Sequence, residues 1–182
     1  MSLKYFGILV AILAVESAVG LDPTIQIKYK KLTSKTPDNP YFKNMVTEIS
    51  DSGEKGTAKF SISKTLPDTT TISVTVELEG QVVADFEDML SELMKNEVYG
   101  KDMLKYGLPK DKFPKESPIS PGDYEISKYP IPKDKFPPGM PPGDYEAKLV
   151  IGEPDLGPWV IVEAVIEISH DVPGVPVPGL GR

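Results

Sequence analysis

Apolar and polar residues alternate along several stretches of the chain, the pattern of a β-strand with one buried face. Ala58, Phe60 and Ile62 alternate with polar neighbours, and the same period of two recurs over residues 72–79. Between these two runs lies the turn-forming sequence Leu-Pro-Asp-Thr at residues 66–69. The pattern therefore predicts two half-buried strands joined as a hairpin.

A second pair of alternating runs lies near the end of the chain. Residues 145–151 and 159–168 each place their apolar side chains on one face, and the turn-rich segment 153–158 separates them. Weaker strand patterns cover three further segments, 24–32, 45–50 and 123–129. About seven short strands separated by turn signals predict an all-β fold, an antiparallel sandwich of two sheets.

One segment has the period of a helix instead. Phe86, Met89, Leu90, Leu93 and Met94 follow the i, i+3, i+4, i+7, i+8 spacing, and charged residues occupy the other face. This spacing predicts one short amphipathic helix over residues 85–94, with Asp85 as its N-cap.

Proline is concentrated between residues 109 and 142, which hold ten of the 19 prolines. Within this stretch Pro-Lys-Asp-Lys-Phe-Pro occurs twice, at 109–114 and 132–137, and Pro-Gly-Asp-Tyr-Glu occurs twice, at 121–125 and 142–146. We interpret the repeats as two Pro-rich loops that each lead into a strand through a Pro-Gly-Asp-Tyr turn. A functional repeat is the alternative.

The two ends of the chain differ from its middle. Lys4, an apolar run over residues 5–15 and Ala18-Val19-Gly20 form the pattern of a cleaved signal peptide over residues 1–20. A membrane anchor is disfavoured because the run is much shorter than the ~20 apolar residues a span needs. We expect a single domain over residues 21–170, a flexible Pro/Gly-rich tail over 171–182, and a secreted or lysosomal protein.

Composition excludes several classes of function. The net charge of −7 and the absence of a basic run argue against nucleic acid as a partner. With no Cys and one His, the chain has neither a thiol nucleophile nor a Cys- or two-His-based metal centre. His170 lies at the end of the last predicted strand, and the common hydrolase, phosphate-loop and metalloprotease motifs are missing. We expect no enzyme, no catalytic residue, no metal and no cofactor.

Several short motifs carry a family resemblance. Tyr106-Gly-Leu-Pro109, Ser117-Pro-Ile-x-x-Gly122-x-Tyr124 and Phe136-Pro-x-x-Met-x-x-Gly143-Asp-Tyr145 resemble the second half of the ganglioside activator proteins of the ML lipid-recognition family. The segments 56–60, 66–67, 74–78 and 86–93 are similar to the strands, turn and helix before it.

The resemblance covers about residues 56–168 and implies an immunoglobulin-like cup in which two sheets enclose a central apolar cavity for lipid tails. The chain departs from the family in its cysteines, whose places are taken by Glu87, Lys110 and Ser117.

These considerations select the candidate site residues. The expected lipid-binding residues are apolar or aromatic: Phe60, Val74, Val76, Met89, Leu90, Leu93, Met94, Met103, Leu104, Tyr106 and Trp159. The helix among them is either a lid or an ordinary core helix, and Trp159 lies either at the mouth of the cup or in the packing of a strand end. Phe136 and Met140 match a membrane-contacting loop of the family, with turn packing as the alternative.

The expected function is a secreted protein that binds or transfers lipid and holds acyl chains of a glycolipid, fatty acid or sterol. Its expected partners are the lipid, a membrane surface contacted transiently, and a lipid hydrolase. The alternative is a secreted interaction protein with a solid core and Pro-rich binding loops.

Overall fold

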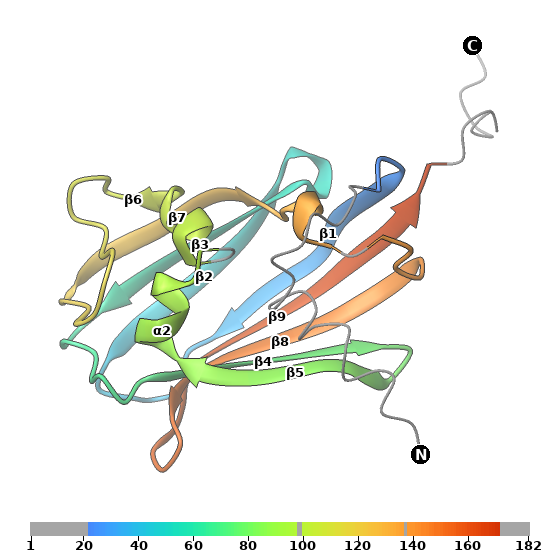
Figure 1. Ribbon diagram of the computed structural model, residues 1–182. Coiled ribbons are helices and arrows are strands. Elements are labelled where there is room, and N and C mark those ends of the chain that lie inside the picture. Colours follow the sequence, from blue (N-terminus) through green and yellow to red (C-terminus); the bar gives the residue numbers. More distant parts are fainter. Residues whose placement is uncertain (1–21, 98–99, 137, 172–182) are drawn as a thin grey trace.

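The computed structural model shows two antiparallel β-sheets that face each other, with two short α-helices beside them (Figure 1). It describes residues 22–97, 100–136 and 138–171. The predicted all-β, two-sheet fold is confirmed. The predicted signal peptide and nearly all of the predicted tail lie outside the described residues.

Sheet A has the strand order β1-β9-β8-β4-β5. Its strands are β1 (Ile25–Lys35), β9 (Gly157–His170), β8 (Gly143–Glu153), β4 (Thr71–Leu78) and β5 (Gln81–Met89). Sheet B has the order β2-β3-β7-β6. Its strands are β2 (Phe42–Ser50), β3 (Lys55–Ile62), β7 (Gly122–Pro130) and β6 (Gly107–Leu108). The helices are α2 (Leu90–Lys95) and α3 (Gly100–Leu104), and the 3₁₀ turns are η1 (Asp51–Gly53) and η2 (Lys133–Lys135).

All seven predicted strands are present, but the first predicted hairpin is wrong. β3 belongs to sheet B and β4 to sheet A, so the segment between them crosses from one sheet to the other. Leu66 in this crossing is 3% exposed, and its backbone N–H donates to the carbonyl of Ile119. A residue at the tip of a hairpin is exposed to solvent, whereas Leu66 packs into the core. The second predicted hairpin, β8 with β9, is confirmed.

The predicted helix begins later than expected, and a second helix follows it. Residues 81–89 form edge strand β5, in which Phe86 pairs with Val74 of β4. Asp85 accepts a hydrogen bond from Thr75 across the strand pair instead of capping a helix. Backbone pairing with β4 outweighs the weak helical preference of this segment. Helix α2 begins only at Leu90.

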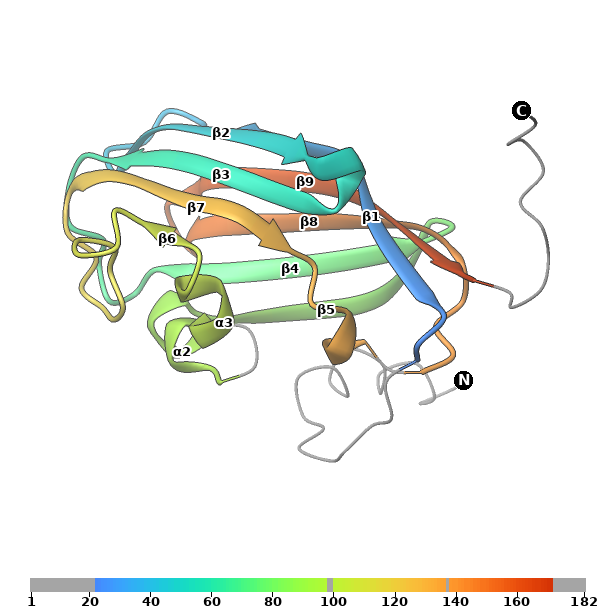
Figure 2. The same cartoon turned by 90° about the horizontal axis from the view of Figure 1, so that it is seen from above.

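The two sheets are joined along one edge, where β1 meets β2. The Ser34 hydroxyl donates to the Met45 carbonyl at 2.8 Å, and the Thr47 hydroxyl donates to the Leu32 carbonyl at 3.2 Å. Figure 2 shows α2 and α3 along the opposite edge, near β5 and β6, whereas η2 lies at the start of β1, where Lys133 donates to the side chain of Gln26. The sandwich is therefore bonded strand to strand on one side and bordered by short helical segments on the other.

Two separate clusters of buried side chains form the core. The first cluster draws on both sheets, α2 and the connecting loops, and contains Phe42, Ile62, Leu66, Met94, Phe113, Ile119, Tyr124, Trp159 and Val160. The second cluster draws on sheet A and the loop before β8, and contains Ile25, Ile27, Met140, Tyr145 and Ile168. The sheets are thus packed against each other at the first cluster, whereas a loop covers sheet A at the second.

Candidate functional site

Small side chains cross the inner face of sheet A between the two core clusters. In the strand register Ala84 of β5 pairs with Val76 of β4, Val76 with Ala147 of β8, Ala147 with Ala164 of β9, and Ala164 with Leu32 of β1. We call this row the midline. Three of its five members are alanines, whose side chains extend less far from the sheet than those of Val, Leu or Ile.

Sheet B presents a similarly small row. Ala58 of β3 pairs with Thr47 of β2 and with Ile126 of β7, and Ile126 pairs with Gly107 of β6. Gly56, the next inward position of β3, also lacks a side chain. Both sheets therefore carry short side chains at the inward positions between their larger apolar residues.

Most inward positions at or beside the midline are half-buried, although Ala84 of β5 is itself buried, at 7% exposed. On β9, Val160 and Ile168 are fully buried, whereas Val162, Ala164 and Ile166 between them are half-buried. On β4 and β8, the inward-facing residues near the midline are likewise half-buried: Val74, Val76, Ala147 and Leu149. In a solid sandwich these inward positions would be the most buried. Solvent therefore reaches the inner faces between the two clusters.

Two hollows lie elsewhere on the described part of the chain. One, of about 10 Å³, lies between α2 and the crossing segment, beside Leu66, Leu90 and Met94, and has the room of roughly one water molecule. The other, of about 660 Å³, is open and lies beside Lys30 and Glu146. Neither hollow is the apolar cavity that the sequence predicts between the sheets.

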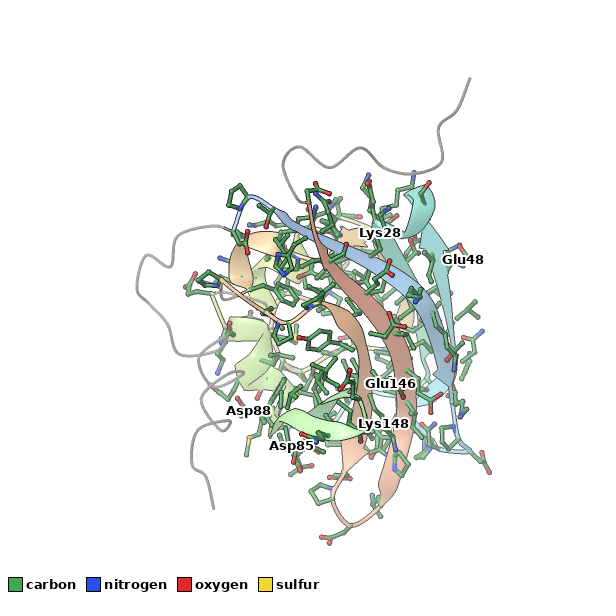
Figure 3. The ribbon with its side chains drawn as sticks, turned by 90° about the vertical axis from the view of Figure 1, so that its right-hand side faces the viewer. Lys28, Glu48, Asp85, Asp88, Glu146 and Lys148 are labelled. Atoms are coloured by element: carbon green, nitrogen blue, oxygen red, sulfur yellow. The ribbon has the colours of Figure 1, made fainter. Side chains whose placement is uncertain are left out.

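The larger hollow is lined mostly by charged residues of the outer face of sheet A. Glu146 and Lys148 are exposed and alternate along β8 with the inward-facing Ala147 and Leu149 (Figure 3). The Lys30 ammonium donates to Asp144, and this hydrogen bond, followed by the charge of Asp144 itself, raises the pKa of Lys30. The hollow is lined by charged side chains together with Pro142 and Ile168 and is open to solvent, so it is not an enclosed apolar cavity.

The predicted lipid-binding residues divide among three environments. Five belong to the first cluster or pack against it: Phe60, Leu90, Met94, Leu104 and Trp159. Val76 lies on the midline and packs against the second cluster, and Val74 lies next to the midline on β4. Leu93, Met103 and Tyr106 are half-buried, and Met89 is 51% exposed on the edge strand. The structure thus places Val76 on the midline and Val74 beside it but does not assemble the whole set there.

Trp159 lies in the packing of a strand end. Its side chain is 1% exposed, and its ring centroid is 4.2 Å from that of Tyr41. Of the two alternatives for this residue, the structure shows the packed strand end and not the mouth of the cup.

Phe136 and Met140 also face inward. Met140 is 8% exposed and belongs to the second cluster, and Phe136 packs against it. In this conformation Met140 packs in the core, as the turn-packing alternative expects. The loop that carries both residues covers the inner face of sheet A.

His170 holds this loop to the sheet. Its Nε2 lies 2.8 Å from the Met140 carbonyl, and its Nδ1 lies 3.2 Å from the Thr24 hydroxyl and 3.4 Å from Asp22. Hydrogen bonds from the Thr24 side chain and backbone are the main causes that lower the pKa of Asp22. These contacts join the start of β1, the end of β9 and the loop before β8.

Sequence reasoning missed Tyr29 and the alanines. The alternating pattern identified Ala58, Ala147 and Ala164 as inward-facing, but their small size was the additional signal for an unfilled interior. Tyr29 faces inward on β1, opposite Ile166, and burial raises the pKa of its phenol to about 12. Its segment was assigned only as a weak strand.

Across the described ranges, no helix is long and apolar enough to cross a membrane. Within the same ranges, no three His, Asp or Glu side chains lie together in a way that would hold a metal ion.

Neither a comparison with protein-family models nor one with the sequences of curated proteins gives a match. Among solved structures, chicken MD-1 complexed with lipid IVa is 11% identical, with a TM-score of 0.33, over 85% of this chain and 96% of that one. A Niemann-Pick type C2 protein from the Japanese carpenter ant is 10% identical, with a TM-score of 0.33, over 81% and 96% of the two chains. Likeness at this level bears on no question of function.

Proposed function

We propose that this protein binds a lipid by taking its apolar chain between the two sheets, against the midline. The supporting observation is the partial exposure of inward-facing apolar residues there, next to clusters that are fully buried. The motif resemblance to the ML family supports the same function. On this proposal the protein is a non-enzymatic carrier of the secretory pathway, and its partners are the lipid, a donor membrane and a lipid hydrolase.

The driving force comes from apolar burial alone. Each CH₂ group moved out of water contributes ~0.8 kcal/mol, so a sixteen-carbon chain needs no ionic partner inside the protein. The bound acyl chain also covers Val74 and Leu149, which are half-buried in the unliganded protein and become more buried on binding.

Filling the midline is the sharpest test. In Ala147→Leu and Ala164→Leu we expect the affinity for a fluorescent sixteen-carbon acyl probe to fall at least tenfold, because the added side chain occupies the space of the ligand. The melting temperature of the unliganded protein stays the same or rises, since the new side chain fills room that is already there. Val165→Leu, on the outer face of β9, is the matched control and leaves both quantities unchanged.

The alternative function, an interaction protein with a solid core, gives the opposite result. Larger side chains in a filled core cost typically 1 to 3 kcal/mol of stability. A fall of that size in both alanine variants, together with a wild-type protein that binds no acyl probe, contradicts the proposal. Native mass spectrometry of the purified chain supplies an independent readout, because a carrier retains lipid whose mass is measurable.

A further inference from the structure

We propose that the Tyr29 hydroxyl is a polar anchor inside the apolar interior and selects ligands that carry one neutral hydroxyl or carbonyl group, such as a long-chain alcohol or ester. This inference rests on the proposed function and specifies the ligand class for the same site.

Tyr29 reaches from one sheet to the other. It faces inward from β1, next to Leu32 of the midline. A Cβ added to Gly56 of β3 would lie 3.2 Å from Cζ of Tyr29, the ring carbon that carries the hydroxyl, and 3.1 Å from Leu32. The missing side chain at Gly56 therefore makes room for the phenol end of Tyr29 at the inner face of sheet B.

The hydroxyl has no hydrogen-bond partner among the described residues. The two buried tyrosines of the clusters differ in this respect, since Tyr124 donates to the Ser120 carbonyl and Tyr145 to the Pro141 carbonyl. Burial is the cause that raises the pKa of Tyr29, so its phenol stays neutral at physiological pH. The Tyr29 side chain is half-buried, and its hydroxyl is not among the enclosed side-chain atoms that lack a partner, so water reaches it. A ligand hydroxyl or carbonyl that enters between the sheets takes the place of that water and gains a hydrogen bond in apolar surroundings.

The surroundings favour a neutral ligand group over a carboxylate or phosphate. The inward positions nearest Tyr29 on sheet A are Ile27, Leu32, Ala164 and Ile166, and on sheet B Gly56 pairs with Ile49 and Tyr129. None of these residues carries a positive charge. A charged group placed there would lose its hydration without gaining a counter-ion. A hydroxyl or carbonyl needs only the single hydrogen bond that Tyr29 offers.

Three probes of equal chain length test the inference. Hexadecane, hexadecan-1-ol and hexadecanoate displace the fluorophore N-phenyl-1-naphthylamine from the wild-type protein and from Tyr29→Phe. In the wild type we expect the alcohol to displace the fluorophore about five- to tenfold better than the alkane, the worth of one neutral hydrogen bond, and better than the carboxylate at pH 7. In Tyr29→Phe the advantage over the alkane disappears, while the melting temperature is unchanged or raised.

Tyr145→Phe is the matched control, because it removes the hydroxyl of a buried tyrosine whose hydroxyl already has a partner in the chain. It lowers the melting temperature but keeps the preference for the alcohol. A preference that survives in Tyr29→Phe, or tighter binding of hexadecanoate, overturns the inference and leaves the proposed function standing. A wild-type protein that releases the fluorophore to none of the probes contradicts the proposed function, and the inference falls with it.

Discussion

Tyr124 and Tyr145 make the same hydrogen bond in two different sheets. Each follows a Pro-Gly-Asp sequence and donates its hydroxyl to the backbone carbonyl four residues earlier, Tyr124 to Ser120 at 3.0 Å and Tyr145 to Pro141 at 2.9 Å. Tyr124 belongs to the first cluster and Tyr145 to the second. The sequence repeat is therefore a structural one, a turn fastened to the strand that follows it.

Removing either hydroxyl should weaken the fold to a similar extent. Tyr124→Phe and Tyr145→Phe each lose one partly buried hydrogen bond, which costs about 1 kcal/mol of the free energy of unfolding. Because the two residues lie in separate clusters, the double variant should lose the sum of the two effects. Urea denaturation measures all three values, and a strongly non-additive double variant would show that the clusters are coupled.

Trp159 provides an optical test of its burial. An indole that is 1% exposed should emit at short wavelength and resist quenching by iodide. Because it lies in the first cluster and away from the midline, its emission should change little when an acyl probe binds. A large shift on binding would place Trp159 at the ligand after all.

The raised pKa of the half-buried Tyr29 predicts a loss of stability in alkali. Its pKa is about 12 in the folded protein against 10.0 for an ordinary tyrosine, so between these values the unfolded chain has released a proton that the folded chain retains. Stability contributed by this group is complete below pH 10 and falls as the pH rises to 12, by up to about 3 kcal/mol. Urea unfolding of wild type and Tyr29→Phe at pH 9 to 11.5 checks this. Parallel curves would contradict the assignment.

The lowered pKa of Asp22 predicts that the stability of the folded protein falls in acid. Hydrogen bonds from Thr24 lower its pKa below 3.8, so the ionised carboxylate stabilises the folded state above that value and this contribution is lost as the pH falls through the folded pKa. Asp22→Asn keeps an acceptor oxygen but no charge. We expect wild type to melt at a higher temperature than the variant at pH 6 and at the same temperature well below pH 3. A difference that is constant with pH would show that the charge has no role.

The strands could be predicted because the alternation of apolar and polar residues within a single segment, such as that around Val74 and Val76, is enough to indicate a strand. The pairing of the strands could not be predicted, because β3 and β4 would show the same alternation whether they formed a hairpin or belonged to different sheets. Burial of Leu66 decides between them, and burial depends on the whole fold. The same limit applies to the site, where Val74 and Val76 were found from the pattern but Tyr29 depends on the empty position at Gly56 of another strand.

The arrangement of the two clusters also determines how the molecule opens. The first cluster joins both sheets, so separating it requires global unfolding. The second joins sheet A to a loop that His170 holds through the Met140 carbonyl, and this loop can detach without breaking any strand pairing. Amide hydrogen exchange should therefore be slow in β3, β7 and β9 and fast, through local opening, in residues 131–136 and 138–142. Such opening uncovers the inner face of sheet A while the rest of the protein stays folded.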